Sequence, residues 1–339
     1  VKSLEYYKTA DSLIIRGSAD PTLMVGDKSN AVIQFLRNQS APIYMVDAQI
    51  DERTYGTGWA WDDYQDYYQP EKSLLPIYGN LLTYEVISDT IVSRPPYFKN
   101  NIYLMDSIGI TRELDQNIFY AARESNALYE VPFKTSNELT ADLLGDLIDK
   151  KVEIIPNRDY EFKTYHGVLY DTVYKKMLTV SDNFIAEQLL LQVGKEVTGA
   201  YSVKTAIEYS LEHYLPDLPQ KPRWVDGSGL SRYNLFTPED MVHLLNKMYE
   251  EIPFSKLLEY FPEGGRSGTL KNWYANEKGK GYVFAKSGSL SNNYNLSGYL
   301  ITKKGTVLIF SSMNNHFMGS NVPIKQDLEH FLKRIYESY

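Results

Sequence analysis

Apolar residues after Val168 recur at the spacing of amphipathic helices, and one polar stretch interrupts them. The interruption is Ser181-Asp182-Asn183, three residue types that commonly cap helices. The apolar positions on its two sides are Val173, Met177 and Leu178, then Phe184, Ile185, Leu189 and Leu190. This pattern predicts a helix, a polar elbow and a second helix. Further along, Thr237-Pro238-Glu239-Asp240 predicts the start of another helix, which runs to about Glu251.

Three apolar runs near the C-terminus have the length of strands. They cover residues 282–286, 296–302 and 306–313, and Lys303-Lys304-Gly305 forms a turn between the last two. The runs predict an antiparallel meander. A final segment predicts an amphipathic helix whose apolar face packs on this sheet. Its apolar positions are Ile324, Leu328, Phe331, Leu332, Ile335 and Tyr336.

Residues 1 to about 155 have a different character, with short strands, turns and little helical periodicity. Residues 12–16 and 43–46 predict strands, and residues 140–150 predict a helix that closes this half. A chain of 339 residues exceeds the usual size of one domain. We therefore expect two or more compact units, or one domain with a large insertion, with a boundary near residues 155–160.

Composition narrows the class of protein. Hydrophobic residues make up 43% and charged residues 23% of the chain, which is typical of a folded globular protein, and no apolar run has the length of a membrane helix. The formal charge of -8 argues against a nucleic-acid partner, which would require a basic surface. The absence of cysteine excludes disulfides, iron–sulfur clusters and thiolate zinc sites. The first residue is Val1, and no signal peptide follows it, so we expect a processed or truncated product.

Several chemistries are excluded by their missing motifs. The five histidines are scattered, so a metal site is not expected. Gly227-Ser228-Gly229 begins like a dinucleotide fingerprint, but Arg232 stands in place of the third glycine. The Gly-x-Ser-x-Gly elbow of lipase-type hydrolases does not occur. We expect no cofactor.

Two short motifs remain, Ser181-Asp182-Asn183 at the elbow and Lys286-Ser287-Gly288 at a strand end. Either motif alone is more often an ordinary cap or turn. Their order and context match the serine acyl-transferases, in which Ser-x-Asn between helices precedes a strand with Lys-[Ser/Thr]-Gly. Acyl transfer needs a proton relay to the leaving amine, which Ser181 and Asn183 can supply. It also needs donors for a carboxylate and an oxyanion, which Lys286, a hydroxyl and a free strand edge can supply.

Longer stretches then resemble the S13-type D-alanyl-D-alanine carboxypeptidases and endopeptidases, the class C low-molecular-mass penicillin-binding proteins. The matching stretches lie at residues 177–187, 225–232, 267–271, 285–290 and 296–299, with weaker matches at 15–23 and 58–63. The resemblance implies an α/β (α+β) fold. Residues 156–339 would be a β-lactamase/transpeptidase-like catalytic body, an antiparallel sheet flanked by helices, and residues 1–155 mainly β inserted domains.

The nucleophile motif of that family, Ser-x-x-Lys, does not occur, because no serine in the chain has a lysine three residues later. The resemblance places this motif upstream of Val1. It also implies that Ser181 passes a proton to the leaving D-alanine, and that Asn183 holds the substrate amide. Lys286 and Ser287 would meet the terminal carboxylate, with Ser287 in place of the more usual threonine. Gly288 would belong to the same substrate-binding strand.

The resemblance further implies that Ser289 donates its backbone N–H to the oxyanion, and that Asp226 and Arg232 have a structural role. We expect Ser181 and Lys286 to lie within a few ångströms of each other. The partners implied are peptidoglycan stem peptides and β-lactam antibiotics, and the location implied is the periplasm or cell envelope. Two other interpretations stay open: a catalytically inactive homologue that binds peptidoglycan or acts as a scaffold, and, less well matched, a β-lactamase.

Overall fold

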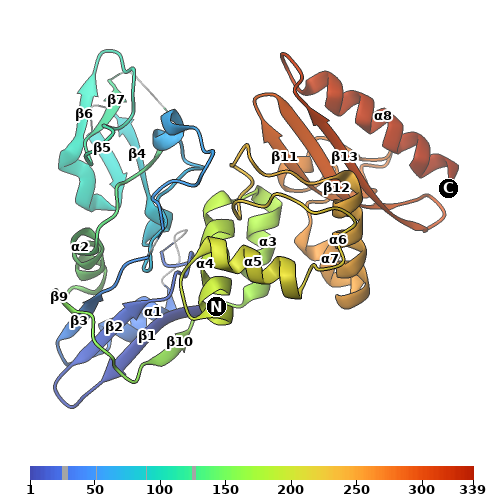
Figure 1. Ribbon diagram of the computed structural model, residues 1–339. Coiled ribbons are helices and arrows are strands. Elements are labelled where there is room, and N and C mark those ends of the chain that lie inside the picture. Colours follow the sequence, from blue (N-terminus) through green and yellow to red (C-terminus); the bar gives the residue numbers. More distant parts are fainter. Residues whose placement is uncertain (25–29, 51, 89, 124–126) are drawn as a thin grey trace. The chain divides into compact units, whose positions relative to one another are not determined.

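The computed structural model describes residues 1–339 except 25–29, 51, 89 and 124–126, and the chain divides into two compact units (Figure 1). The first unit comprises Val1–Leu169 and Phe184–Ala206, and the second comprises Tyr170–Asn183 and Ile207–Tyr339. Each unit has its own hydrophobic core. The two are therefore described separately.

A five-stranded mixed sheet, in the order β10-β1-β2-β3-β9, belongs to the first unit. Its strands are β1 (Lys2–Lys8), β2 (Leu13–Gly17), β3 (Ile43–Asp47), β9 (Val152–Pro156) and β10 (Lys163–His166). Strand β1 is antiparallel to both of its neighbours, whereas β2, β3 and β9 are parallel to one another. Because parallel neighbours need a crossover connection, helices α1 (Ala31–Arg37) and α2 (Asn137–Ile148) lie in the connections between them.

Helix α1 is an element that the sequence pattern did not predict. It has only seven residues, too few to show helical periodicity, and its buried Val32 and Ile33 are β-branched. Asn30 starts the helix, because its side chain accepts a hydrogen bond from the backbone N–H of Val32. The strands predicted at 12–16 and 43–46 and the helix predicted at 140–150 are confirmed as β2, β3 and α2.

Smaller sheets complete the first unit. Strands β4 (Leu81–Ile87), β5 (Thr90–Arg94) and β8 (Tyr129–Pro132) form an antiparallel sheet, and β6 (Ile102–Met105) pairs in parallel with β7 (Phe119–Ala122). Three short 3₁₀ segments are Trp61–Gln65, Tyr78–Asn80 and Pro96–Asn101. The core is rich in fully buried aromatic rings, among them Tyr84, Phe98, Phe119 and Phe133. Helix α4 (Asn183–Thr198) also lies almost entirely in this unit.

The compact units do not coincide with a division at residue 155. Strand β9 pairs with β3, and β10 pairs with β1, so the chain stays in the first sheet until His166. The division predicted at residues 155/156 separates inserted domains from a catalytic body, which is a different distinction from that between compact units. It stays a prediction.

The second unit contains the predicted antiparallel meander, which is confirmed as β11 (Val283–Leu290), β12 (Asn293–Ile301) and β13 (Val307–Asn315). Its helices are α3 (Tyr170–Val180), most of α5 (Val203–His213), α6 (Pro238–Glu251), α7 (Phe254–Tyr260) and α8 (Val322–Ser338), with a 3₁₀ turn at Gly268–Leu270. The predicted helix start is confirmed at Pro238, and Thr237 and Asp240 form a capping box there. Among helices in the described part of the chain, none is long and apolar enough to cross a membrane.

Helices cover both faces of the meander. Leu300 lies in the cluster formed with α8, whereas its neighbour Tyr299 lies in the cluster formed with α6 and α7. Successive side chains of a strand point to opposite faces, so the central strand β12 is buried on both sides. Helix α8 lies along one face of the sheet, as the amphipathic pattern predicted (Figure 1).

The packing of α8 can be tested with two adjacent residues. Leu332 is 2% exposed and Phe331 is 50% exposed. We expect Leu332→Ala to lower the free energy of unfolding by about 2–5 kcal/mol, because it leaves a cavity against the sheet. Phe331→Ala should cost no more than about 1 kcal/mol. Urea titrations followed by tryptophan fluorescence measure both values, and equal losses would contradict this packing.

Candidate active site

The elbow between α3 and α4 has a left-handed backbone conformation at Ser181, whose φ is 60°. The backbone N–H of Asp182 donates to the carbonyl of Met177 at 3.0 Å and so closes the last turn of α3. Asn183 then begins α4. A residue with a side chain pays a conformational cost in this region, and such residues cluster at functional sites. The elbow therefore presents a hydroxyl at a position where glycine would be less strained.

Lys286 lies on β11 and reaches the elbow from 105 residues away in the sequence. Its Nζ donates a hydrogen bond to Ser181 Oγ at 2.7 Å. It also donates to the carbonyl oxygen of Ser287. The predicted proximity of Ser181 and Lys286 is confirmed, and the two motifs form one polar site within the second unit.

The electrostatic state of Lys286 follows from its surroundings. Burial removes water from the ammonium group and lowers the pKa of Lys286 to about 8. The ammonium is thus still charged at neutral pH but gives up its proton more readily than an ordinary lysine. A perturbed pKa and a strained elbow at the same place are the combination expected of a functional site.

Strand β11 has one edge that is only partly covered. Its inner edge pairs with β12 along the whole strand. At its outer edge, Val283 O accepts from Gly264 N at 2.8 Å, and Ala285 N donates to Pro262 O at 3.2 Å. Backbone groups alternate along a strand, so those of residues 287 and 289 also point to the outer edge. Beyond Ala285 no described strand pairs with this edge, and it can receive an extended peptide.

The hydroxyl of Ser287 is held by a residue to which the sequence motifs gave no role. Ser287 is 8% exposed, and its Oγ donates to Thr269 Oγ1 at 2.9 Å. Thr269 follows Gly268, whose φ is 52°. A Cβ at position 268 would come within 1.9 Å of the carbonyl oxygen of Thr179, so only glycine allows this close approach to α3. The signal in the sequence was the Ser267-Gly268-Thr269 stretch.

The remaining predicted site residues lie around this centre. Gly288 and Ser289 are exposed on β11, after Ser287. Asn183 is half-buried in the first turn of α4, two residues after Ser181. The described residues contain no group of three or more histidine and acidic side chains that could hold a metal ion.

The loop that starts at Asp226 supports the turn after β11. Asp226 is buried, and its carboxylate accepts hydrogen bonds from the backbone N–H groups of Gly229 at 2.8 Å and Ser231 at 2.6 Å. Arg232 in the same loop donates to Ser291 Oγ at 3.1 Å and Asn292 Oδ1 at 3.0 Å. These contacts are those of a structural support, which is the role suggested from the sequence.

Comparison with known proteins identifies similar sequences. Residues 169–334 match the family model for the D-Ala-D-Ala carboxypeptidase 3 (S13) family. The D-alanyl-D-alanine carboxypeptidase DacB of Haemophilus influenzae is 29% identical over 168 residues, which cover 44% of this chain and 33% of that protein. The chain spans about a third of the length of the curated relatives it matches.

Two solved structures are similar in fold. Penicillin binding protein 4 from Haemophilus influenzae matches with a TM-score of 0.78 and 18% identity, covering 99% of this chain and 86% of that chain. A predatory peptidoglycan endopeptidase from Bdellovibrio bacteriovorus matches with a TM-score of 0.51 and 17% identity, covering 98% of this chain and 79% of that chain. The fold is accordingly β-lactamase/transpeptidase-like with additional sheets, as the sequence predicted. Residues 169–334 of this chain are thus similar to the D-Ala-D-Ala carboxypeptidase 3 (S13) family.

Proposed function

We propose that a protein containing this chain is a serine-type D-Ala-D-Ala carboxypeptidase or endopeptidase that cleaves peptidoglycan stem peptides through an acyl-enzyme. The observation that carries the proposal is the 2.7 Å hydrogen bond between Lys286 Nζ and Ser181 Oγ beside the free end of β11. The names of the relatives, which include a carboxypeptidase and a peptidoglycan endopeptidase, support the same substrate class.

The proton path follows from the direction of this hydrogen bond. Lys286 donates to Ser181 Oγ, which leaves the hydroxyl proton of Ser181 free to point at a substrate. When the amide C–N bond breaks, Ser181 gives that proton to the leaving amine of D-alanine. Lys286 then restores the hydroxyl of Ser181, a transfer favoured because the pKa of Lys286 is lowered to about 8.

Substrate binding uses the same strand. The peptide lies along the outer edge of β11, with its terminal carboxylate at Lys286 and at the hydroxyl of Ser287, which turns its proton from Thr269 to the carboxylate when the peptide binds. Asn183 holds the amide of the substrate. The backbone N–H of Ser289 donates to the oxyanion, since the backbone groups of residue 289 point outward.

The nucleophile is contributed by residues outside 1–339, because no serine of this chain is followed by lysine three residues later. The serine oxygen attacks the carbonyl carbon of the penultimate D-alanine and gives its proton to the lysine of its own Ser-x-x-Lys motif, while an ester forms as the C–N bond breaks. That proton balances the one that Lys286 and Ser181 deliver to the leaving amine, and water later hydrolyses the ester. A β-lactam would be attacked in the same way, which makes penicillins covalent inhibitors. The peptidoglycan substrate places the protein in the periplasm or cell envelope.

A catalytically inactive homologue that binds peptidoglycan is the second candidate function. The substrate-binding residues Asn183, Lys286 and Ser287 would serve binding alone equally well. The lowered pKa of Lys286 and its bond to Ser181 favour the enzyme, because binding a carboxylate needs only a charged group.

Covalent labelling distinguishes the two functions. We expect the full-length protein encoded by the gene to be labelled by a fluorescent penicillin, and Ser181→Ala to slow labelling by about 10²–10⁴-fold, because the proton relay is lost. Ser255→Ala, which changes another serine of the second unit, should label at the original rate. A full-length protein that never acquires label at millimolar drug would support the binding role.

The pKa of Lys286 makes carboxylate binding pH-dependent. In the free protein the ammonium is charged below pH 8 and neutral above it. The affinity of this chain for N-acetyl-D-Ala-D-Ala should therefore be constant up to about pH 7 and fall about tenfold per unit above pH 8. Isothermal titration calorimetry from pH 6 to 10 measures the profile. Lys286→Met should bind the peptide weakly at every pH. Lys278 is exposed, so the matched control Lys278→Met should bind as the unchanged chain does and show the same fall in affinity above pH 8. A flat profile to pH 10 would contradict the role of Lys286.

A further inference from the structure

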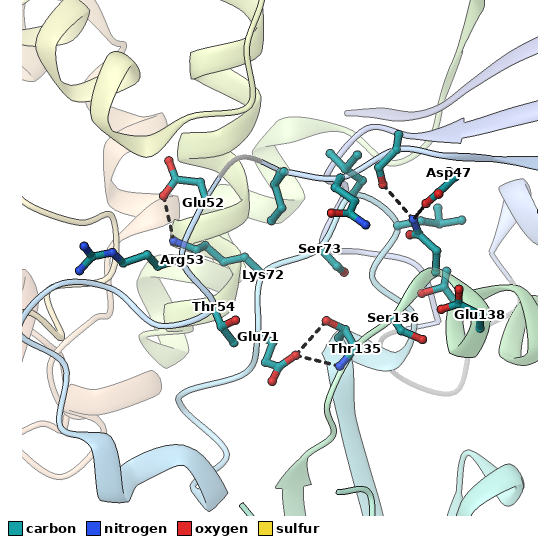
Figure 2. A pocket seen from close by; sticks show the side chains of 17 residues that line it. Asp47, Glu52, Arg53, Thr54, Glu71, Lys72, Ser73, Thr135, Ser136 and Glu138 are labelled. Carbon is teal, nitrogen blue, oxygen red and sulfur yellow. Dashed lines mark hydrogen bonds and ion pairs between the residues drawn. The ribbon is translucent and has the colours of Figure 1, made fainter. Parts of the chain in front are cut away.

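A polar cavity of about 350 Å³ lies within the first unit. Three parts of the chain line it: residues 47–50 with 52–54, the stretch 71–75, and residues 135–138 with 140 at the start of α2 (Figure 2). None of the lining residues takes part in the proposed peptidase chemistry. The volume is at the lower end of the range for small-molecule sites.

Two adjacent charged residues line this cavity and are buried. Glu71 is 5% exposed and Lys72 is 7% exposed. Figure 2 shows Lys72 extending toward Glu52 and Glu71 extending toward Thr135. Buried charges are costly unless ion pairs and hydrogen bonds together compensate them. The contacts of these two groups show whether that compensation is complete.

Lys72 has a charge partner but incomplete hydrogen bonding. Its Nζ lies 3.6 Å from Glu52 Oε2, and 5.9 Å from the centre of the Trp59 ring. Glu52 is itself held from its other oxygen, which accepts from the backbone N–H of Val203 at 2.6 Å. At 3.6 Å the contact with Glu52 is longer than a hydrogen bond, so it leaves the three N–H donors of the ammonium group available.

Glu71 carries the opposite charge, and its hydrogen bonding is also incomplete. Its Oε2 accepts from the backbone N–H of Thr135 at 2.8 Å and from Thr135 Oγ1 at 2.9 Å. Its Oε1 is buried and accepts no hydrogen bond from the described residues, although Lys134 Nζ is 3.5 Å away. The cavity is thus lined by a buried carboxylate oxygen that accepts no hydrogen bond from the described residues, and by an ammonium group whose ion pair is longer than a hydrogen bond.

We propose that this cavity binds a small zwitterion that carries a carboxylate and a primary ammonium group, such as an amino acid or a short peptide with free ends. The carboxylate accepts hydrogen bonds from Lys72 Nζ, and the ammonium donates to Glu71 Oε1. Charge-assisted hydrogen bonds of this kind are stronger than neutral ones. An anion alone would meet the acids at Glu71 and Glu52, and a cation alone would meet Lys72, so each singly charged ligand satisfies only one group.

Calorimetric titration of the 339-residue chain tests this site. The ligands are glycine, diglycine and triglycine, which separate the two charges by increasing lengths, with acetate and methylammonium as singly charged references. We expect at least one zwitterion to bind saturably and about tenfold or more tightly than either reference. If no zwitterion binds saturably at millimolar concentration, or if acetate binds as well as the best zwitterion, the proposal is overturned.

Substitutions then locate the binding. Lys72→Met and the nearly isosteric Glu71→Gln should each weaken binding of the best zwitterion by about tenfold or more. The matched exposed controls Lys99→Met and Glu130→Gln in the same unit should leave the affinity unchanged. Circular dichroism identifies any variant that does not fold, and the comparison of ligands on the unchanged chain decides the case if both variants unfold. Unchanged affinity in a folded Lys72→Met or Glu71→Gln variant would also overturn the proposal. None of these outcomes bears on the peptidase function, which uses other residues.

Discussion

The hydrogen bond from Lys286 Nζ to Ser181 Oγ is the interaction on which the proposed chemistry depends. It joins a strand to an elbow between helices, and it places a desolvated ammonium, with its pKa lowered to about 8, beside a hydroxyl. Desolvation strengthens the bond and at the same time makes the proton of Lys286 easier to transfer. One contact therefore gives the site both its geometry and its capacity to move a proton.

The rest of the second unit keeps these two groups in place. Helices on both faces of the meander fix the position of β11, while residues 262–264 cover only the first part of its outer edge. Gly268 allows the turn that carries Thr269 to approach the last turn of α3, and Thr269 then orients the hydroxyl of Ser287. The free outer edge of β11, the hydroxyl of Ser287 and the ammonium of Lys286 consequently lie together in the second half of this strand.

The sequence was most informative where local pattern and chemistry coincide. The elbow, the capped helix α6, the meander and α8 were predicted because each has a strong periodicity or a cap. The motifs also predicted that Ser181 and Lys286 meet. Helix α1 was missed because seven residues with two β-branched positions show no period. The contact of Thr269 with Ser287 and the buried pair Glu71 and Lys72 depend on tertiary packing, which no local pattern records.

The most direct test of the account is the titration of Lys286 itself. Lysine side chains of the 339-residue chain can be followed by ¹³C NMR after reductive methylation, with Lys286→Arg used to assign the signal. The account predicts that the pKa of Lys286 is about 8 and that Ser181→Ala changes its chemical shift, because the two groups are in contact. An ordinary lysine value near 10.4, unaffected by Ser181→Ala, would contradict it.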